Sequence, residues 1–224
     1  WWCENVLGVR LWRMQKEIIE AVRDNPRVSV RSADSIGKSY TAACTVLWFL
    51  YNFNPCTVIT TAPTFRQVES ILWREIAGRY SQSKYPLGGK LTNVQLDIAE
   101  NWFAIGLSTD VPERFQGFHN ENILVVGDEA SGLSEQVFDS FENPLASGHT
   151  RLLLIGTPTQ IAGGFYRSFT SELYKTFHIS AFDSPNFTGL TLEDFKNQQW
   201  QTKVKPAPYP SLVSPQWVAD QLSE

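Results

Sequence analysis

A run of eight residues, Ser32-Ala-Asp-Ser-Ile-Gly-Lys-Ser39, carries side chains suited to binding a phosphate chain. Gly37 lets the backbone approach an anion, Lys38 can reach the outer phosphates, and the Ser39 hydroxyl is a ligand for Mg²⁺. The run fits the pattern GxxxxGK followed by Ser or Thr, except that Ser32 replaces the first glycine. It predicts a phosphate-binding loop; the alternative is a chance Gly-Lys-Ser. The expected nucleotide-binding residues are Ser32, Ala33, Asp34, Ser35, Ile36, Gly37, Lys38 and Ser39.

Two adjacent acids, Asp128 and Glu129, come directly after the apolar run Ile123-Leu-Val-Val-Gly127. In a parallel sheet, ligands bind beyond the carboxyl ends of the strands. Carboxylates after a buried strand are costly unless they are solvated or bind a metal. We therefore predict that Asp128 and Ser39 hold Mg²⁺ and that Glu129 accepts a proton from the attacking water. The alternative is a strand-end turn with solvated acids.

Two further polar residues are candidates for contacts with a nucleotide. Thr157 follows the apolar run 152–155, and its hydroxyl can sense a γ-phosphate or a water, although a simple turn explains it equally well. Gln15 lies upstream of the loop, and its amide can read an adenine edge with one donor and one acceptor. The alternative for Gln15 is ordinary solvation at a helix surface.

The elements that must position these residues alternate along the chain. Apolar periodicity and turn signals predict strands and helices, with a β-hairpin over about 94–107. The alternation indicates an α/β fold with a mainly parallel central sheet flanked by helices. The expected strands are 27–31, 57–61, 123–126, 151–155 and 176–181, and the expected helices are 11–22, 38–53, 65–80, 134–145, 192–199 and 215–223.

Composition limits the classes of protein that remain. The 224 residues are 42% hydrophobic and 13% aromatic, which argues against disorder, and the formal net charge of −4 gives no basic surplus for nucleic acid. Any DNA contact must come from a local patch or from another part of the protein. Cys3, Cys44 and Cys56 lack metal spacing and predict buried, reduced thiols. The most apolar window, 40–51, is too short to span a bilayer, so we expect no membrane partner.

With these residues in place, the chain resembles the N-terminal ATPase domain of tailed-bacteriophage terminase large subunits over nearly its whole length. Residues 31–39 resemble that family's variant Walker A loop, which often lacks the first glycine. The other similar segments are Val58-Ile-Thr-Thr-Ala-Pro-Thr-Phe-Arg-Gln67, Phe115-Gln-Gly-Phe-His119 with Asp128-Glu129-Ala130, Gly156-Thr157-Pro158 of the coupling motif, and Ser180-Ala-Phe-Asp-Ser-Pro-Asn186.

This resemblance implies a RecA-like P-loop NTPase of the additional-strand, conserved-glutamate (ASCE) class that uses ATP and Mg²⁺. It implies an ATPase that packages double-stranded DNA into a procapsid, with the portal protein, the small terminase subunit and further copies of itself in a ring as partners. The isolated domain is expected to be a monomer. The expected location is the host cytoplasm, with transient docking on the procapsid.

The resemblance also implies a C-terminal nuclease that cuts concatemeric DNA. Lys203-Pro-Ala-Pro-Tyr-Pro210 is proline-rich and predicts a linker. We therefore divide the chain into an ATPase domain, 1–202, and a segment, 203–224, comprising the linker and the start of a nuclease region that is absent here.

Ring ATPases complete each site with an arginine from a neighbouring subunit. Arg114, in the loop before the two acids, is the candidate for this role; the alternative is a surface pair with Glu113 or Asp110. Arg31 is a second candidate, beside the loop of its own chain. Some family members have an arginine where this chain has Asp34, and an acid near phosphates is unfavourable unless it points away or binds metal.

Two other functions remain open from the sequence. The first is a fragment of a helicase-like ATPase, whose second domain this chain is too short to contain. The second is a nucleotide-binding scaffold without hydrolysis, which Ser32 and Asp34 favour and Glu129 opposes.

Overall fold

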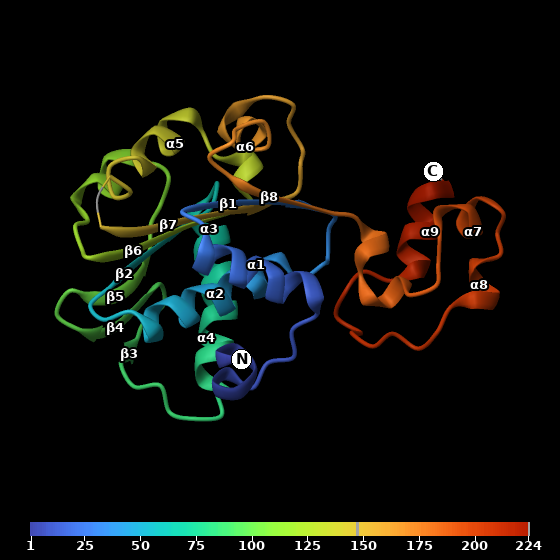
Figure 1. Ribbon diagram of the computed structural model, residues 1–224, viewed down its shortest axis with the longest axis horizontal. Helices are drawn as coiled ribbons and strands as arrows, with labels where there is room; N and C mark the ends of the chain where they lie inside the picture. The colour runs from blue at the N-terminus through green and yellow to red at the C-terminus, as the bar shows by residue number, and fades with distance from the viewer. Residues whose placement is uncertain (147, 224) are drawn as a thin grey trace.

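A mostly parallel sheet forms the centre of the molecule (Figure 1). The computed structural model describes residues 1–146 and 148–223, and over these residues eight strands form one sheet in the order β3-β4-β5-β2-β6-β7-β1-β8. The strands are β1 Arg27–Ser32, β2 Thr57–Thr61, β3 Lys90–Leu91, β4 Gln95–Ala99, β5 Trp102–Gly106, β6 Asn122–Asp128, β7 His149–Gly156 and β8 Lys175–Ile179.

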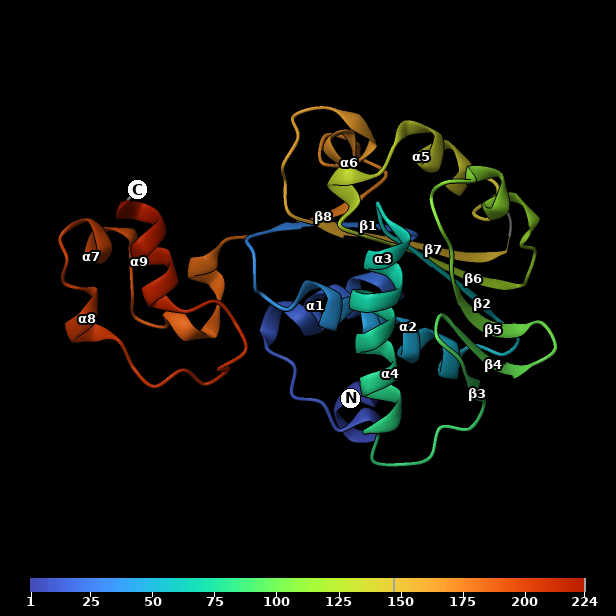
Figure 2. The same cartoon turned by 180° about the vertical axis from the view of Figure 1, so that it is seen from behind.

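Helices cover both faces of this sheet. In Figures 1 and 2, α1, α2 and α4 lie on one face, and α5 and α6 lie on the other. Helices α7 to α9 form a small lobe beyond the edge strand β8. The helices are α1 Arg13–Asp24, α2 Lys38–Asn52, α3 Phe65–Gln67, α4 Arg74–Ser81, α5 Glu135–Phe141, α6 Gly163–Ser168, α7 Leu192–Lys196, α8 Trp200–Lys203 and α9 Pro215–Ser223.

The central strands are apolar throughout because both of their faces are buried. Along β6, Leu124 and Val126 pack into the core under α1 and α2, whereas Ile123 and Val125 pack into the core under α5. Successive side chains of a strand point to opposite faces, so one apolar run supplies both cores. This explains why these strands show no alternation of polar and apolar residues in the sequence.

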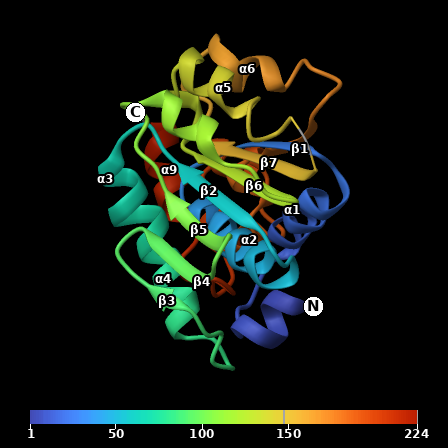
Figure 3. The ribbon, with the colours of Figure 1, turned by 90° about the vertical axis from the view of Figure 1, so that its left-hand side faces the viewer.

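The observed topology confirms the predicted fold class. Strands β2, β6, β7, β1 and β8 run parallel, and β5 is parallel to β2. The expected hairpin is present, with β4 antiparallel to β5 and β3 antiparallel to β4. Figure 3 faces the sheet from the side of this hairpin, which forms one edge. Strand β7 lies between β1 and β6, as the additional strand of an ASCE fold does.

Several predicted boundaries were wrong for identifiable reasons. The helix expected over 134–145 ends at Phe141, shortly before Pro144, whose ring disfavours helix in the residue before it. The strand expected over 176–181 ends at Ile179, because the backbone N–H of Ser180 donates to Asp183 Oδ2 at 2.7 Å and starts a turn.

Two predicted helices are also interrupted. The helix expected over 65–80 contains a wider π-helical turn, Val68–Trp73, between α3 and α4. That turn carries the fully buried Trp73, whose Nε1 donates to Thr60 Oγ1 at 2.9 Å. The helix expected over 192–199 ends at Lys196, and Gln198 has a positive φ of 56° before α8 begins.

The proline-rich segment after Lys203 folds back onto the C-terminal lobe. Asn186 is 6% exposed, and its Nδ2 donates to the carbonyl oxygens of Tyr209, Leu212 and Val213 at 2.9, 3.3 and 3.2 Å. Val218 of α9 is buried in the same core as Leu212 and Val213. Glu224, the last residue of the expected linker segment, lies outside the described residues. The division at residue 202 stays a prediction.

No helix within residues 1–146 and 148–223 has the length and apolar character needed to cross a membrane.

The contact between Gly106 and Trp73 makes a prediction about stability. A Cβ at Gly106 would lie 2.5 Å from Trp73 Nε1 and 2.7 Å from Val68 Cγ1. We expect Gly106→Ala to lower the free energy of unfolding by about 1–3 kcal/mol, because the crowded side chains are buried. Chemical denaturation monitored by circular dichroism measures this change.

The matched control is Gly78→Ala in α4, where a Cβ meets no atom of the described structure within 4 Å. There the substitution should stabilise the protein by about 0.5–1 kcal/mol through helix propensity. Equal effects of the two substitutions would contradict the packing described around Trp73.

Candidate nucleotide-binding site

The candidate residues meet because three neighbouring strands are parallel and in register. Arg31 of β1 pairs with Gly156 of β7, and Ile155 of β7 pairs with Asp128 of β6. The three strands therefore end at the same edge of the sheet. The segments that follow them are the phosphate-loop candidate, the two acids and the Thr157 segment.

The loop between β1 and α2 is held from outside through its carbonyl groups. The carbonyl oxygen of Ile36 accepts from Trp12 Nε1 at 3.4 Å, that of Gly37 accepts from Gln15 Nε2 at 3.3 Å, and that of Ser35 accepts from the N–H of Val213 at 2.7 Å. None of the described residues accepts a hydrogen bond from the backbone N–H groups of Asp34–Gly37. Backbone N–H groups left unpaired at a helix N-terminus are the groups that bind phosphate.

Gly37 is required where it stands. Its φ of 85° is in the left-handed region, and a Cβ would lie 2.6 Å from Gln15 Nε2. Gln15 is 3% exposed, and its Oε1 accepts from the backbone N–H of Trp12 at 3.2 Å. The amide therefore links the start of α1 to the loop. It still has one donor hydrogen and one acceptor lone pair for a further partner.

The Ser39 hydroxyl and Asp128 lie together at the base of the site. Ser39 Oγ donates to Asp128 Oδ2 at 2.8 Å, and the N–H of Glu129 donates to Oδ1 at 3.0 Å. Asp128 is 2% exposed, and this burial raises its pKa to about 6 against the lowering effect of the Ser39 hydrogen bond. A buried carboxylate without a paired cation is a group that a metal ion stabilises.

These two oxygen donors fit Mg²⁺, which is commonly bound by one or two protein oxygens while phosphates and water fill its other positions. No cluster of three or more His, Cys, Asp or Glu side chains suited to a metal occurs in the described ranges. Within the described ranges, the two oxygen donors are compatible with a metal ion whose other ligands come from phosphate and water.

Glu129 adopts an unusual backbone conformation beside the loop. Its φ of 47° and ψ of 44° are left-handed, which is uncommon for a residue other than glycine. The turn is packed tightly against the end of β7, since a Cβ at Gly156 would lie 2.9 Å from the N of Ala130. Such strained residues cluster at functional sites, where the surrounding structure holds them.

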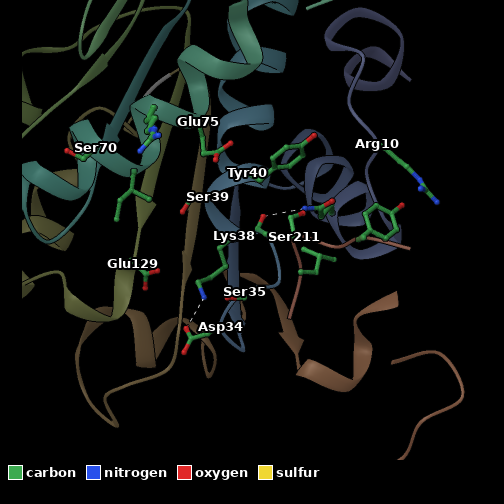
Figure 4. Close-up of a pocket in the computed structure, with 16 residues that line it drawn as sticks. Arg10, Asp34, Ser35, Lys38, Ser39, Tyr40, Ser70, Glu75, Glu129 and Ser211 are labelled. Atoms are coloured by element: carbon green, nitrogen blue, oxygen red, sulfur yellow. Dashed lines mark hydrogen bonds and ion pairs between the residues drawn. The ribbon is translucent and has the colours of Figure 1, made fainter. Parts of the chain in front are cut away.

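An open cavity of about 820 Å³ lies over the loop, large enough for a nucleotide (Figure 4). The structure brings seven of the predicted residues to its wall, while Asp128 and Thr157 reach it through hydrogen bonds to Ser39 and Lys38. The seven are Gln15, Asp34, Ser35, Gly37, Lys38, Ser39 and Glu129.

Other predicted residues lie outside this cavity. Ile36 is buried in the core, whereas Arg31, Ser32 and Ala33 line a separate hollow on the far side of the loop. The Arg31 guanidinium is 2.7 Å from His178 Nδ1 and lies over the Phe169 ring.

Arg114 is also away from the cavity. It is exposed on a 3₁₀ helix, Pro112–Gly117. No acid among residues 1–146 and 148–223 forms an ion pair with it, so the expected alternatives, Glu113 and Asp110, are not its partners here.

The cavity wall includes residues that the sequence did not indicate. They come from the segment before α1, from α2, from the helical segment after β2, and from the C-terminal lobe. Tyr209 stacks on the Arg10 guanidinium at 4.6 Å, and neither position carries a motif. The additional lining residues are Arg10, Tyr40, Ser70, Ile71, Arg74, Glu75, Tyr209, Ser211 and Leu212.

The strand order β8-β1-β7-β6-β2, with the loop after β1 and the acids after β6, defines a RecA-like fold of the ASCE class. Within this class, the chain is 29% identical over 165 residues, or 69% of its length, to a probable terminase large subunit of Enterobacteria phage P7. The chain spans 33% of that relative. No protein-family model matches the chain.

Solved structures of large terminases share this fold. The large terminase ATPase domain of Thermus phage P74-26, solved as a mutant, superposes with a TM-score of 0.67 at 18% identity and covers 92% of this chain and 95% of its own. The large terminase of a thermophilic bacteriophage, solved with ADP, gives a TM-score of 0.60 at 13% identity over 88% of this chain and 51% of its own. These similarities confirm the resemblance to terminase large subunits.

The buried carboxylate of Asp128 gives a prediction for the metal-free protein. Burial raises its pKa from 3.8 to about 6, so between about pH 4 and 6 the folded protein keeps a proton that the unfolded chain releases. Stability therefore falls as the pH rises through this window, by on the order of 2–3 kcal/mol. Asp128→Asn should remove this dependence, as measured by denaturation with a chelator present.

Asp139→Asn, a change at an exposed acid of α5, serves as the control and should retain the wild-type pH profile. A profile for Asp128→Asn that matches the wild type would show that Asp128 titrates normally.

Proposed function

We propose that this chain binds ATP with Mg²⁺ in the 820 Å³ cavity and hydrolyses it. The observation that carries the proposal is the convergence of Lys38, Ser39, Asp128 and Glu129 on a loop with unpaired N–H groups. Related folds have been solved with ADP and ATP-gamma-S, which supports a nucleotide as the ligand.

In this proposal each of these residues has a separate role. The N–H groups of the loop and the Lys38 ammonium would bind the phosphates, and the Ser39 hydroxyl and Asp128 would hold the metal ion. Bound Mg²⁺ supplies charge neutralisation of the phosphate oxygens. Glu129 accepts a proton from water as the water oxygen attacks the γ-phosphorus, and the bond to the bridging oxygen of ADP breaks.

Arg10 and Glu129 lie on opposite sides of the cavity (Figure 4), and in this proposal the nucleoside end of the ligand points toward Arg10. Gln15 keeps one donor and one acceptor for a base edge. Tyr209 and Leu212 supply apolar surface from the C-terminal lobe. In this proposal Gln15 remains the residue expected to form hydrogen bonds with the adenine edge.

At the level of the whole protein, we propose the motor of viral genome packaging. In this proposal ATP hydrolysis moves double-stranded DNA into a procapsid, while the protein forms a ring on the portal protein, receives DNA from the small terminase subunit and docks from the host cytoplasm. A nuclease region beyond this chain would cut the DNA. Similarity to the phage P7 protein supports this role.

A scaffold that binds nucleotide without hydrolysis is the second candidate, because Asp34 lies 3.5 Å from the Lys38 ammonium. The two candidates differ in whether the bound ATP is hydrolysed, a step for which the first candidate needs Glu129.

Phosphate release separates these candidates. We expect Glu129→Gln to bind ATP with near wild-type affinity but to lose turnover by roughly 10²–10⁴-fold, since the amide keeps the shape and loses the basicity. Lys38→Ala should lose roughly 10²–10³-fold in turnover with weaker binding. A colorimetric phosphate assay with parallel calorimetry measures both. Turnover that persists in Glu129→Gln would remove Glu129 as the base.

A mixing experiment tests Arg114 as the arginine supplied by a neighbour. Neither Arg114→Ala nor Glu129→Gln should turn over well alone, because an arginine supplied in trans is worth ~10³–10⁵ in rate. Assemblies of both variants should recover part of the activity, since a site with Glu129 can receive Arg114 from the other subunit.

Arg13→Ala is the control, as Arg13 is 76% exposed and makes only a 3.8 Å pair with Glu17. Full activity of Arg114→Ala on its own, with no gain in proven mixed assemblies, would exclude Arg114 from the mechanism.

A further inference from the structure

Three oxygen atoms surround the ammonium group of Lys38. Its Nζ donates to the carbonyl oxygen of Ala33 at 3.2 Å and to Thr157 Oγ1 at 2.8 Å, and it lies 3.5 Å from Oδ1 of Asp34. The Lys38 side chain is only 7% exposed, so water does little to neutralise its charge. A buried ammonium needs a counter-ion from the protein, and Asp34 supplies it.

The Thr157 hydroxyl links the Asp34 carboxylate to the Lys38 ammonium. Its hydroxyl accepts a hydrogen bond from Lys38 and donates its own hydrogen to Asp34 Oδ1 at 2.8 Å. A hydroxyl has one hydrogen to donate, so this bond uses its whole donor capacity. Hydrogen bonds with an ionised partner are stronger than those between neutral groups, and the Thr157 hydroxyl makes two of them, one with Lys38 and one with Asp34. Asp34, Thr157 and Lys38 thus form a closed group across the ends of β1 and β7.

A phosphate needs the same two partners. The Lys38 ammonium is the cation for its outer oxygens, and the Thr157 hydroxyl can donate to one of them only after it releases Asp34. A phosphate and a carboxylate at one ammonium repel each other. Asp34 is 62% exposed, so its side chain has solvent-filled space into which it can rotate (Figure 4).

We propose that Asp34 is a built-in counter-ion that competes with the phosphates of the nucleotide for Lys38 and Thr157, and so lowers the affinity of the site. This inference rests on the proposed function, and it names the residue that sets how tightly the site binds. It accounts for an acid in a loop that binds anions: the acid neutralises Lys38 until a phosphate replaces it.

The test is Asp34→Asn, which keeps an oxygen for the Thr157 hydroxyl and removes the charge. Calorimetric titration with Mg²⁺ and ATP-gamma-S, and separately with ADP, should show binding roughly three- to thirty-fold tighter than in the wild type. The gain should shrink in molar salt, where the Debye length is ~3 Å, because it arises from a charge. Asp139→Asn makes the same change of charge at α5 and should leave affinity unchanged.

Thermal unfolding gives a second readout that a merely structural role would not produce. Without nucleotide, Asp34→Asn should unfold at a lower temperature than the wild type, because Lys38 loses its counter-ion. With saturating nucleotide, the upward shift of the midpoint should be larger in the variant. A variant that is destabilised equally with and without nucleotide would overturn the inference.

The outcomes separate this inference from the proposed function. If the wild type binds nucleotide and Asp34→Asn binds equally or more weakly, Asp34 does not compete with phosphate and the inference alone is wrong. If only the variant binds, the inference is supported in its strongest form. If neither binds, the proposed function is wrong and the inference is wrong with it.

Discussion

The site depends on the parallel register of β1, β7 and β6. Backbone hydrogen bonds fix Arg31 opposite Gly156 and Ile155 opposite Asp128, so the three strand ends lie side by side. If either strand pair shifted by one residue, each side chain of the shifted strand would point to the opposite face of the sheet. Its apolar residues would then no longer pack against the helices that now cover them. Because both faces of these strands are buried, the apolar packing enforces the register, and the register in turn fixes the distances among the polar groups.

The charged side chains of the cavity wall explain why phosphate binding would depend on the backbone N–H groups of the loop. The cavity wall carries the cations Arg10, Lys38 and Arg74 against the anions Asp34, Glu75 and Glu129. The side chains alone therefore give no surplus of positive charge for a polyphosphate. In the proposed function, the unpaired N–H groups at the start of α2 and a bound metal ion would supply the rest. An acidic protein with a net charge of −4 can thereby recognise an anion.

The sequence predicted the central strands and the residues at their ends, because apolar runs and a spaced motif are local signals. Lys38 begins α2 as expected, and β2 has the predicted bounds, Thr57–Thr61. Tertiary features escaped prediction. Arg10 and Tyr209 meet across the chain without a motif, and Arg31 turns toward His178 because β8 pairs beside β1. The π-helical turn Val68–Trp73 places Trp73 against a partner, Thr60, that only the fold provides.

The hydrogen bond from Val213 to Ser35 joins two segments that nearly the whole described chain separates. During synthesis, the loop leaves the ribosome long before the lobe that contributes Tyr209, Ser211 and Leu212 to the cavity wall. Contacts of such large separation form late, since the intervening chain must be ordered first. The sheet and its loop can therefore assemble on the nascent chain, whereas the cavity wall is completed only when the C-terminal lobe has emerged.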